Sequence, residues 1–357
     1  MTNGATERVP AIVLGGTGYV AGELLRLIAA HPRLSLAGIM SDGSPGEPVA
    51  KAFPHLAPVY ADEYFKSQSQ IEGLLRTERA PAILSAAPHG VSAALIDSLL
   101  TVAEGAGNTP RIVDISADFR YASAAAYEAV YKHPHGAPAR IGQFTCAVPE
   151  HLRELKTPHV AHPGCFATTI LLAAVPLLAL DLIEPQLFVA AVTGSTGSGR
   201  KPVEGTHHPL RHADLYAYNA LEHRHTAEIT ACAKGASGVA AHFAFVPHSG
   251  PYARGIHATV QAVLKRPLSA DALRAQLADF YRHAPLVQVT EKPPRLKDVA
   301  ASGYARLGVA SDTRTVAVMS VADNLNKGAA GGAMQWMNRL LGFPETMGLT
   351  APAAGWT

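Results

Sequence analysis

A glycine-rich turn between a short apolar strand and a helical pattern constrains the fold of this chain more than any other feature. Residues 9–14 read as a strand, the turn Gly15-Gly16-Thr17-Gly18 follows, and apolar positions recur with helical spacing over residues 20–30. Residues 35–40 read as a second strand, so the first 40 residues predict a βαβ unit. Glycines let a backbone approach a pyrophosphate, and a helix N-terminus supplies N–H groups and positive dipole. The turn therefore predicts a dinucleotide site, and a plain tight turn is the alternative.

The alternation of strands and helices defines a fold class for each half of the chain. Strand-like residues 82–86 and 111–115 flank a helical pattern over 91–104, which favours a doubly wound parallel sheet up to about residue 160. Longer strands follow at 187–193, 239–246, 255–264 and 315–322, with helical patterns at 269–281 and 327–341. We therefore predict an α/β chain with a Rossmann-type domain over residues 1–163 and an α+β domain over residues 164–325.

Composition excludes several partners. Lys plus Arg is 30 and Asp plus Glu is 28, which gives no electrostatic reason to expect nucleic acid or an anionic membrane. The longest apolar run, residues 170–180, contains Pro176, whereas a membrane span needs about 20 apolar residues. The first ten residues contain no apolar signal core, and three cysteines are too few for a disulfide scaffold. We expect a cytoplasmic protein in which Cys146 and Cys232 are buried and inert.

The sequence His162-Pro163-Gly164-Cys165 precedes a helical apolar run, which puts Cys165 at or just before a helix N-terminus. The positive end of the helix favours a thiolate there, so Cys165 is a candidate nucleophile; a buried inert cysteine is the alternative. A nucleophile needs a base, and the cluster His223-Arg224-His225 offers one, with Glu228 at helical spacing to orient the imidazole of His225.

Two further segments are candidate ligand sites. Gly194-Ser195-Thr196-Gly197 begins a second glycine-rich turn after a strand; it could approach a nicotinamide or an oxyanion closely, or be a flexible surface loop. Ser41 and Ser44, at the end of the second strand, suit a ribose 2′-phosphate, whereas Asp42 disfavours one, so NADP is slightly preferred and NAD is not excluded.

Arginine and histidine add weaker candidates. Arg120 follows the strand at 111–115 and Arg254 begins the strand at 255–264; each suits an anionic ligand, although either alone reads as a surface charge. His207, His208 and His212 match no common zinc spacing, so we expect no metal.

Eight motifs in order resemble the N-acetyl-γ-glutamyl-phosphate reductase family, which is related to aspartate-semialdehyde dehydrogenase. They run from about residue 9 to residue 341 and are GGTGYVAGELL, SAAPHG, DISADFR, HPGC, GSTGSGR, HRHTAEI, PHSGPYARGI and DNLNKGAAGGAMQWMN. The resemblance implies NADPH-dependent reduction of an acyl phosphate through a thioester, a small-molecule substrate and a homodimer or homotetramer. It also implies that a C-terminal helix, residues 326–357, completes the NADP-binding domain, and that residues 164–325 form the substrate and oligomerisation domain.

The resemblance also assigns roles to residues of this chain. Cys165 corresponds to the nucleophile and His225 to the acid/base. The substrate contacts are Arg120 for the phosphate, Arg254 for a carboxylate, and His223 and Glu228. The cofactor contacts are Gly15, Thr17, Gly18, Tyr19, Val20, Ser41, Ser44, Pro88, Ser195, Gly197 and Asn324.

The chain departs from the family in places that leave alternatives open. Ala21-Gly22 reverses the usual order of the third glycine and the next residue, and Thr206-His207-His208-Pro209 resembles a subgroup that includes reductases for carrier-protein-bound aminoadipyl phosphate. A carrier-bound glutamyl or aminoadipyl phosphate is therefore the alternative substrate. A dinucleotide-binding regulator would need no Cys165, and a Cys/His hydrolase would need no dinucleotide turn, so the presence of both features disfavours each of these classes.

Overall fold

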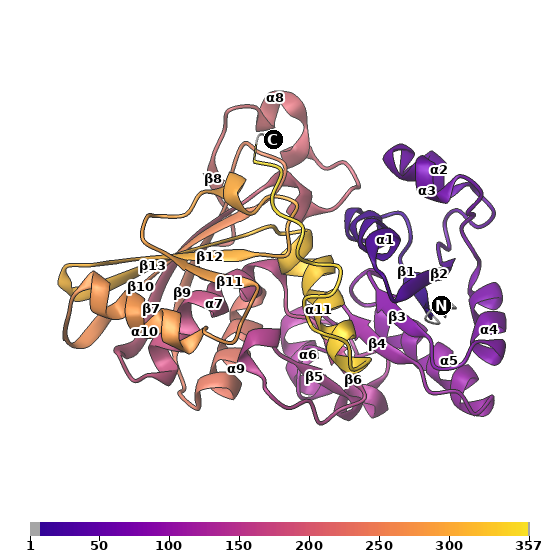
Figure 1. Cartoon of the computed structure of the whole chain (residues 1–357), viewed down its shortest axis with the longest axis horizontal. Coiled ribbons are helices and arrows are strands. Elements are labelled where there is room, and N and C mark those ends of the chain that lie inside the picture. The colour runs from indigo at the N-terminus through magenta and orange to yellow at the C-terminus, as the bar shows by residue number, and fades with distance from the viewer. Residues whose placement is uncertain (1–7, 356–357) are drawn as a thin grey trace, which may run out of the picture. The chain divides into compact units, whose positions relative to one another are not determined.

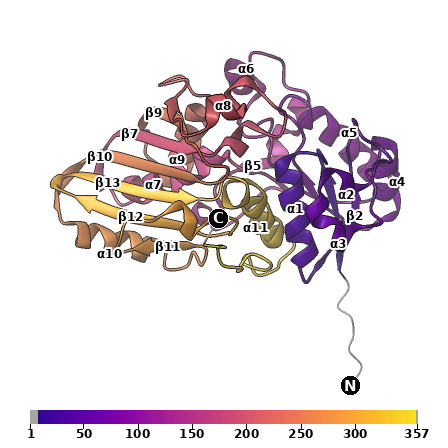
Figure 2. The same ribbon diagram turned by 90° about the horizontal axis from the view of Figure 1, so that it is seen from above.

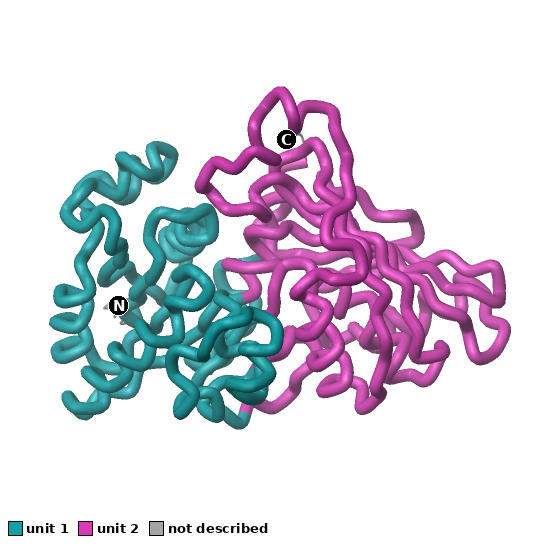
Figure 3. Tube along the Cα trace, turned by 180° about the vertical axis from the view of Figure 1, so that it is seen from behind, with its two compact units in different colours: residues 1–145, 156–162, 333–349 teal, residues 146–155, 163–332, 350–357 magenta. Residues whose placement is uncertain are grey.

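A computed structural model describes residues 8–355, so the first seven residues, on which the expectation about a signal core partly rests, lie outside the described residues. The chain divides into two compact units (Figure 3). Unit 1 contains Met1–Thr145, Lys156–His162 and Ala333–Leu349, and unit 2 contains Cys146–Leu155, Pro163–Gly332 and Thr350–Thr357. The main division, after His162, falls one residue before the expected one. Residues 146–155, 326–332 and 350–357 belong to unit 2 instead of the first domain.

The reason for this difference is visible within unit 2. Val148 packs in the hydrophobic core of unit 2, and the carboxylate of Glu150 pairs with the buried ammonium of Lys327 at 2.5 Å. The segments around residues 150 and 327 are therefore held together by burial and charge, which no local sequence pattern indicates.

Unit 1 is built on a six-stranded sheet, in which the pairings from β2 to β6 are parallel (Figure 1). The strand order is β2 (Leu34–Ile39), β1 (Val9–Leu14), β3 (Ala82–Ser85), β4 (Arg111–Asp114), β6 (His159–Ala161), β5 (Phe144–Cys146). Its helices are α1 (Tyr19–Ala30), α2 (Val49–Ala52), α3 (Ala57–Tyr60), α4 (Gln68–Thr77), α5 (Ser92–Gly105) and α6 (Ala124–Tyr131). The predicted βαβ unit and doubly wound sheet are confirmed.

The glycine turn after β1 lies at the point where the strand order changes direction, between β2 on one side and β3 on the other. Ligands of doubly wound sheets bind at this switch point. Gly15 has a φ of 79°, and a Cβ there would lie 2.4 Å from the carbonyl oxygen of Ala86 beyond β3. No other residue type therefore fits at position 15.

The C-terminal segment is not the single helix predicted over residues 326–357. A π-helical turn (Asn326–Ala330) leads into α11 (Gly331–Leu340), and the chain then turns at Gly342, whose φ is 71°. Phe343 N–H donates to the carbonyl of Asn338, which closes the helix end. The part of α11 that belongs to unit 1 is held by His31, whose Nε2 lies 3.0 Å from Oδ1 of Asn338.

Unit 2 is built on a seven-stranded mixed sheet, which confirms the predicted α+β architecture. Figure 2 shows β9, β7, β10, β13 and β12 side by side in that order. The full order is β11 (Val287–Thr290), β12 (Ala305–Ser311), β13 (Thr313–Ala322), β10 (Ile256–Leu268), β7 (Ile183–Thr193), β9 (His242–Ser249), β8 (Tyr216–Ala217). Its helices are α7 (Cys165–Ala179), α8 (His208–Arg211), α9 (His225–Ser237) and α10 (Ala270–Phe280).

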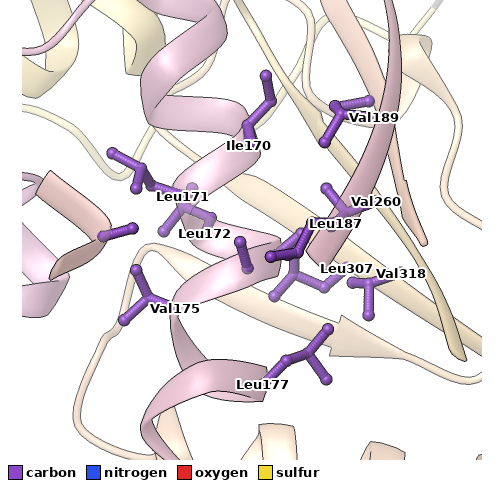
Figure 4. Packing of buried hydrophobic residues seen from close by; sticks show 14 of the residues in the cluster. Ile170, Leu171, Leu172, Val175, Leu177, Leu187, Val189, Val260, Leu307 and Val318 are labelled. Atoms are coloured by element: carbon purple, nitrogen blue, oxygen red, sulfur yellow. The ribbon is translucent and has the colours of Figure 1, made fainter. Parts of the chain in front are cut away.

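Helix α7 forms the centre of the hydrophobic core of unit 2 (Figure 4). Ile170, Leu171 and Val175 belong to one cluster with Leu187 of β7 and Val318 of β13. Helix α7 is apolar on every side, and nearly all of its residues are buried. This is the pattern of an internal helix. Burial on every side fixes the position of its first residue, Cys165.

The other face of this sheet carries apolar side chains that the chain itself leaves uncovered. Inward residues of β10 such as Val260 are fully buried, whereas Val263 of β10 and Phe188 of β7 are each 53% exposed. Alternation along the strands therefore produces one core face and one exposed, partly apolar face.

Candidate active site

Cys165 is the first residue of α7, as the sequence predicts. Gly164 is the N-cap in an extended conformation, and its carbonyl accepts the first helical hydrogen bond, from Thr168 N–H. Gly164 has no side chain that could accept hydrogen bonds from the N–H groups of the first turn. The positive end of the α7 dipole therefore acts on the sulfur of Cys165 and favours its thiolate form.

Gly164 brings two side chains of α9 against the backbone beside Cys165. A Cβ at position 164 would lie 2.7 Å from Nε2 of His225 and 2.7 Å from Oε1 of Glu228. Only glycine therefore allows the imidazole and the carboxylate to approach this closely. The predicted association of Cys165 with His225 and Glu228 is present in the structure.

Glu228 has a more specific contact than the one predicted for it. Its carboxylate is fully buried, and Oε1 accepts a hydrogen bond from Gly164 N–H at 2.9 Å. The carboxylate thus caps the start of α7 from another helix, a role usually played by a local side chain. It fixes the loop that presents Cys165.

His223 is held as a neutral imidazole. Burial, and then the positive charge of Arg224, lower the pKa of His223 to about 4. Its Nδ1 accepts the backbone N–H of His225 at 3.2 Å. The ring proton therefore resides on Nε2, and His223 presents a hydrogen-bond donor rather than a charge.

These residues share one cavity of about 490 Å³, a size typical of small-molecule sites. It lies entirely within unit 2, between the start of α7, the start of α9 and the ends of β7 and β9. Its lining residues are Cys165, Phe166, Thr193, Gly197, Ser198, Tyr216, Tyr218, Asn219, Glu222, His223, Arg224, His225 and Ser249. Burial raises the pKa of Tyr218, and proximity to Cys165 contributes, so its phenol stays protonated at neutral pH.

The second glycine-rich turn forms one wall of this cavity. Ser195 N–H donates to the carbonyl of Tyr252, and Gly197 faces the cavity. Asn324 holds the turn in place: its Oδ1 accepts Gly255 N–H at 2.7 Å, and its Nδ2 donates to Oγ1 of Thr196 at 3.0 Å. The contact of Asn324 with the cofactor stays a prediction; in the structure its side chain contacts this turn.

The π-helical turn Asn326–Ala330 is a feature of the site that the sequence motifs did not predict. A Cβ at Gly328 would lie 2.8 Å from Cβ of Cys165, so the turn packs directly against the backbone of the candidate nucleophile. Such turns are frequent at functional sites. The run of small residues from Gly328 to Gly332 is the signal that could have indicated this close packing.

The dinucleotide turn lies in unit 1. Gly18 is the N-cap of α1, no side chain caps it, and the first turn of α1, which Tyr19 and Val20 begin, contains no acidic residue. A Cβ at Gly18 would meet almost nothing, so the space in front of the turn is open, and Thr17 lies at its partly exposed edge. These features fit a pyrophosphate.

The structure also explains why Gly22 follows Ala21 in this turn, the reverse of the usual order. A Cβ at Gly22 would lie 2.7 Å from the ring of Phe53, so glycine at position 22 leaves room for this ring.

The backbone of a basic residue, Lys66, lies beside the end of β2, and no local sequence pattern indicates this pairing. Ser41 is buried, and its N–H donates to the carbonyl of Lys66; Ser44 N–H donates weakly to the carbonyl of Ser41. Lys66 is brought beside β2 by a bridge to Met40. Pro88 lies beyond β3, where its carbonyl accepts from the first residues of α5.

The two predicted anion-binding arginines both have protein partners. Arg120 is buried, and it donates from Nε to the carbonyl of His162 at 3.0 Å and from Nη2 to that of Ile115 at 2.6 Å. Arg254 donates from Nε and Nη2 to the two carboxylate oxygens of buried Asp323. Their roles toward substrate remain predictions.

Cys146 and Cys232 are partly exposed rather than buried, which corrects the expectation for them. Cys232 of α9 packs against the core of unit 2, and its sulfur is 3.7 Å from that of Cys146, with both residues present as thiols.

Within residues 8–355, no three histidine, cysteine or acidic side chains are grouped so that they could hold a metal ion. In the same part of the chain, no helix is both long and apolar enough to span a membrane.

Comparison with known proteins identifies the class. Residues 10–155 match the family "semialdehyde dehydrogenase, NAD binding domain", and residues 165–324 match "semialdehyde dehydrogenase, dimerisation domain". A solved aspartate semialdehyde dehydrogenase II from Vibrio cholerae shares the fold, with a TM-score of 0.68 and 15% identity over 94% of this chain and 98% of that one. Unit 1 thus contains the nicotinamide dinucleotide-binding domain of these enzymes.

Sequence relatives narrow the class further. An N-acetyl-γ-glutamyl-phosphate reductase from Nitrosococcus oceani is 37% identical over 96% of this chain and 98% of the relative. One from Methanopyrus kandleri is 36% identical over 95% of this chain and 97% of the relative. The chain belongs to the semialdehyde dehydrogenase family, in its N-acetyl-γ-glutamyl-phosphate reductase branch.

Proposed function

We propose that this protein reduces N-acetyl-γ-glutamyl phosphate to N-acetyl-glutamate 5-semialdehyde and phosphate, with NADPH as reductant, in arginine biosynthesis. The observation that carries the proposal is the joint placement of Cys165 at the start of α7 and His225 against Gly164, in one cavity. Relatives with this name match nearly the whole chain.

Cys165 supplies the nucleophile. Its thiolate attacks the acyl phosphate carbonyl, the C–O bond to phosphate breaks, and a thioester remains on the sulfur. Arg120 is the proposed contact for the departing phosphate. Arg254, His223 and Glu228 are the other proposed substrate contacts, and for Glu228 the bond to Gly164 N–H supports an indirect role through the position of Cys165.

The nucleotide is held by unit 1. Gly15, Thr17, Gly18, Tyr19 and Val20 are proposed to cradle its pyrophosphate, and Pro88, Ser195, Gly197 and Asn324 to contact the nicotinamide end. When bound, NADPH supplies a hydride to the thioester carbonyl. His225 holds a proton at its imidazole and gives it to the oxygen that becomes negative, as a general acid. The C–S bond then breaks as the hydroxyl returns its proton to His225, which releases the semialdehyde and regenerates the thiolate of Cys165.

We infer a preference for NADP over NAD. Ser41 and Ser44 follow β2, and the backbone of Lys66 pairs with this end of the strand, so we propose that its ammonium group adds a positive charge beside the two hydroxyl groups. Hydroxyl and basic groups suit a ribose 2′-phosphate, and Asp42 is the one opposing charge.

We propose a homodimer or homotetramer, in a cytoplasmic setting that keeps Cys165 reduced. The exposed face of the seven-stranded sheet, with Phe188 and Val263, supports this assembly, because a second copy would cover it. The match of this unit to a dimerisation domain agrees.

The reverse reaction tests the proposal. Purified protein is given N-acetyl-glutamate 5-semialdehyde and phosphate, with NADP or NAD in separate assays, and reduced nucleotide is followed by absorbance. Phosphate-dependent reduction of NADP supports the reaction, substrate and cofactor together. No reduction by folded protein that binds NADPH would reject the acetylglutamate substrate and favour the carrier-bound alternative. Binding without acyl chemistry would favour a regulator, and ester hydrolysis without nucleotide binding a hydrolase.

A further inference from the structure

Arg211 is a buried cation beside the active-site cavity to which neither the sequence motifs nor the proposed chemistry assigns a role. It ends the short helix α8, and the residue is only 8% exposed. Its Nη1 donates to Oγ of Ser249 at 2.6 Å, and its Nη2 donates to the carbonyl of Gly250. Arg211 is therefore fixed at the end of β9.

This arginine lacks the carboxylate that normally accompanies a buried guanidinium. Among the residues that the structure describes, Arg211 forms no ion pair, and its buried Nε has no hydrogen-bond acceptor. Tyr252 is close by, but its hydroxyl donates to the carbonyl of Val192. Arg254, by contrast, is paired with Asp323. Burying a charge without a counter-ion is costly, so such a site is suited to an anion supplied by a ligand.

Ser249 connects this charge to the cavity. It lines the cavity that contains Cys165 and His225, and its hydroxyl oxygen accepts a hydrogen bond from Arg211. A hydroxyl that accepts in this way retains its own hydrogen to donate. No acceptor for that hydrogen exists among residues 8–355. The hydroxyl of Ser249, polarised by Arg211, is thus a donor for an oxyanion in the cavity.

We propose that Arg211 and Ser249 form the subsite for an oxyanion of the substrate, with Ser249 making the direct hydrogen bond and Arg211 supplying the charge behind it. The inference rests on the proposed function, in which the substrate carries two oxyanions, a carboxylate and a phosphoryl group. Arg211 is then a positioning residue that acts through Ser249. Its effect falls on substrate affinity more than on the chemical step.

The test uses Arg211→Met and Ser249→Ala in the reverse reaction, with KM measured separately for semialdehyde and for phosphate. Loss of the direct bond that Arg211 polarises predicts a rise of about 10- to 100-fold in one KM for Ser249→Ala, and a rise in the same KM, equal or smaller, for Arg211→Met. A higher KM for semialdehyde identifies the carboxylate as the ligand, and a higher KM for phosphate identifies the phosphoryl group. In either case we expect kcat to change less than about threefold, and Arg211→Lys to lie between Arg211→Met and wild type.

Arg282→Met is the matched control, because Arg282 is exposed and lies on the surface beyond α10. Both KM values within twofold of wild type in folded Ser249→Ala and Arg211→Met would overturn the proposal, as would a loss confined to kcat.

A second measurement separates failure of this subsite from failure of the proposed function. Alkylation of Cys165 by iodoacetamide is followed by mass spectrometry, with N-acetyl-glutamate or inorganic phosphate as protectant; it needs no turnover. Protection of the wild type that is lost in Ser249→Ala supports the subsite even if the reductase assay fails. Equal protection in both proteins, or protection in neither, contradicts it.

Discussion

The carboxylate of Glu228 accepts the backbone N–H of Gly164 at 2.9 Å, across 64 residues of sequence. This bond connects the first turn of α9, which carries His225, to the N-cap of α7, which precedes Cys165. The acid/base and the nucleophile are therefore held by one shared contact rather than by two independent elements.

Replacement of Glu228 should impair turnover through this contact. We expect Glu228→Ala to lower kcat about 100-fold, since it leaves the N–H of Gly164 buried without an acceptor and loosens the loop before Cys165. Glu228→Gln retains an acceptor and should lose only about 10-fold. Steady-state kinetics on both variants decides the matter; equal losses would mean that the charge of Glu228, not its bond to Gly164, is what turnover requires.

Cys165→Ser should lose nearly all turnover and bind NADPH normally, because an oxygen nucleophile is far weaker here. Turnover and nicotinamide fluorescence measure the two effects. Cys232→Ser, which changes a thiol of α9 outside the cavity lining, serves as the control and should retain activity. More than about a tenth of wild-type activity in Cys165→Ser would exclude the covalent mechanism.

Gly328→Ala should reduce kcat at least about 10-fold. The added methyl group would lie 2.8 Å from Cβ of Cys165, and a displacement of the nucleophile by a fraction of an ångström weakens its attack. Gly235→Ala in α9 is the matched control, because a Cβ at position 235 meets nothing within 4 Å. The control should be neutral or slightly stabilising, as alanine favours helices. A Gly328→Ala enzyme with unchanged kcat and unchanged iodoacetamide reactivity would show that this packing is not needed.

Lys66→Met should weaken NADPH binding about 5- to 10-fold and leave NADH binding unchanged, since only NADPH carries a 2′-phosphate for the ammonium group to contact. Fluorescence titration with each nucleotide gives both dissociation constants. Lys51→Met removes an exposed lysine paired with Glu47 and should change neither constant. If Lys66→Met weakened the binding of NADPH and NADH equally, Lys66 would contact a part of the cofactor other than the 2′-phosphate.

The free energy of unfolding should fall as the pH drops from about 6.5 towards 4. Burial, and then the charges of Arg111 and Arg140, lower the pKa of His159 to about 4, so the unfolded chain binds its proton at a higher pH than the folded chain does. The stability that neutral His159 provides is complete above the unfolded pKa and is lost through this window, by roughly 2–3 kcal/mol. Denaturant unfolding at several pH values measures the slope. The slope should be shallower in His159→Gln, and an identical slope would assign the acid sensitivity to other groups.

Local sequence predicted the elements whose signals are local. The strand β1, the glycine turn and α1 were located to within a residue, because the turn chemistry and the helical periodicity occupy adjacent residues. The start of α7 at Cys165 followed from Gly164 and the apolar run after it. The strands β11 and β12 were missed, since their partner strands, not their short alternation, stabilise them.

The site was predicted where a motif contains its chemistry and missed where it depends on contacts distant in sequence. Cys165, His223 and His225 are close in space, as their motifs suggested. Lys66 and Arg211 have no local pattern that separates them from surface charges; pairing with β2 and the end of β9, respectively, gives them their positions. The side chain of Asn324 holds a backbone turn, a structural contact that its motif did not indicate, and its contact with the cofactor stays a prediction.

The return of the last segment to unit 1 has a consequence for the order in which the protein is made. His31 meets Asn338 only after 307 further residues have been synthesised, and Trp336, which is fully buried, emerges equally late. Unit 1 therefore begins first, and its last segment, Ala333–Leu349, leaves the ribosome only after the long segment Pro163–Gly332 of unit 2. A nascent chain that stops short of α11 lacks part of the core of unit 1, so the nucleotide-binding half reaches its full stability only when translation is almost finished.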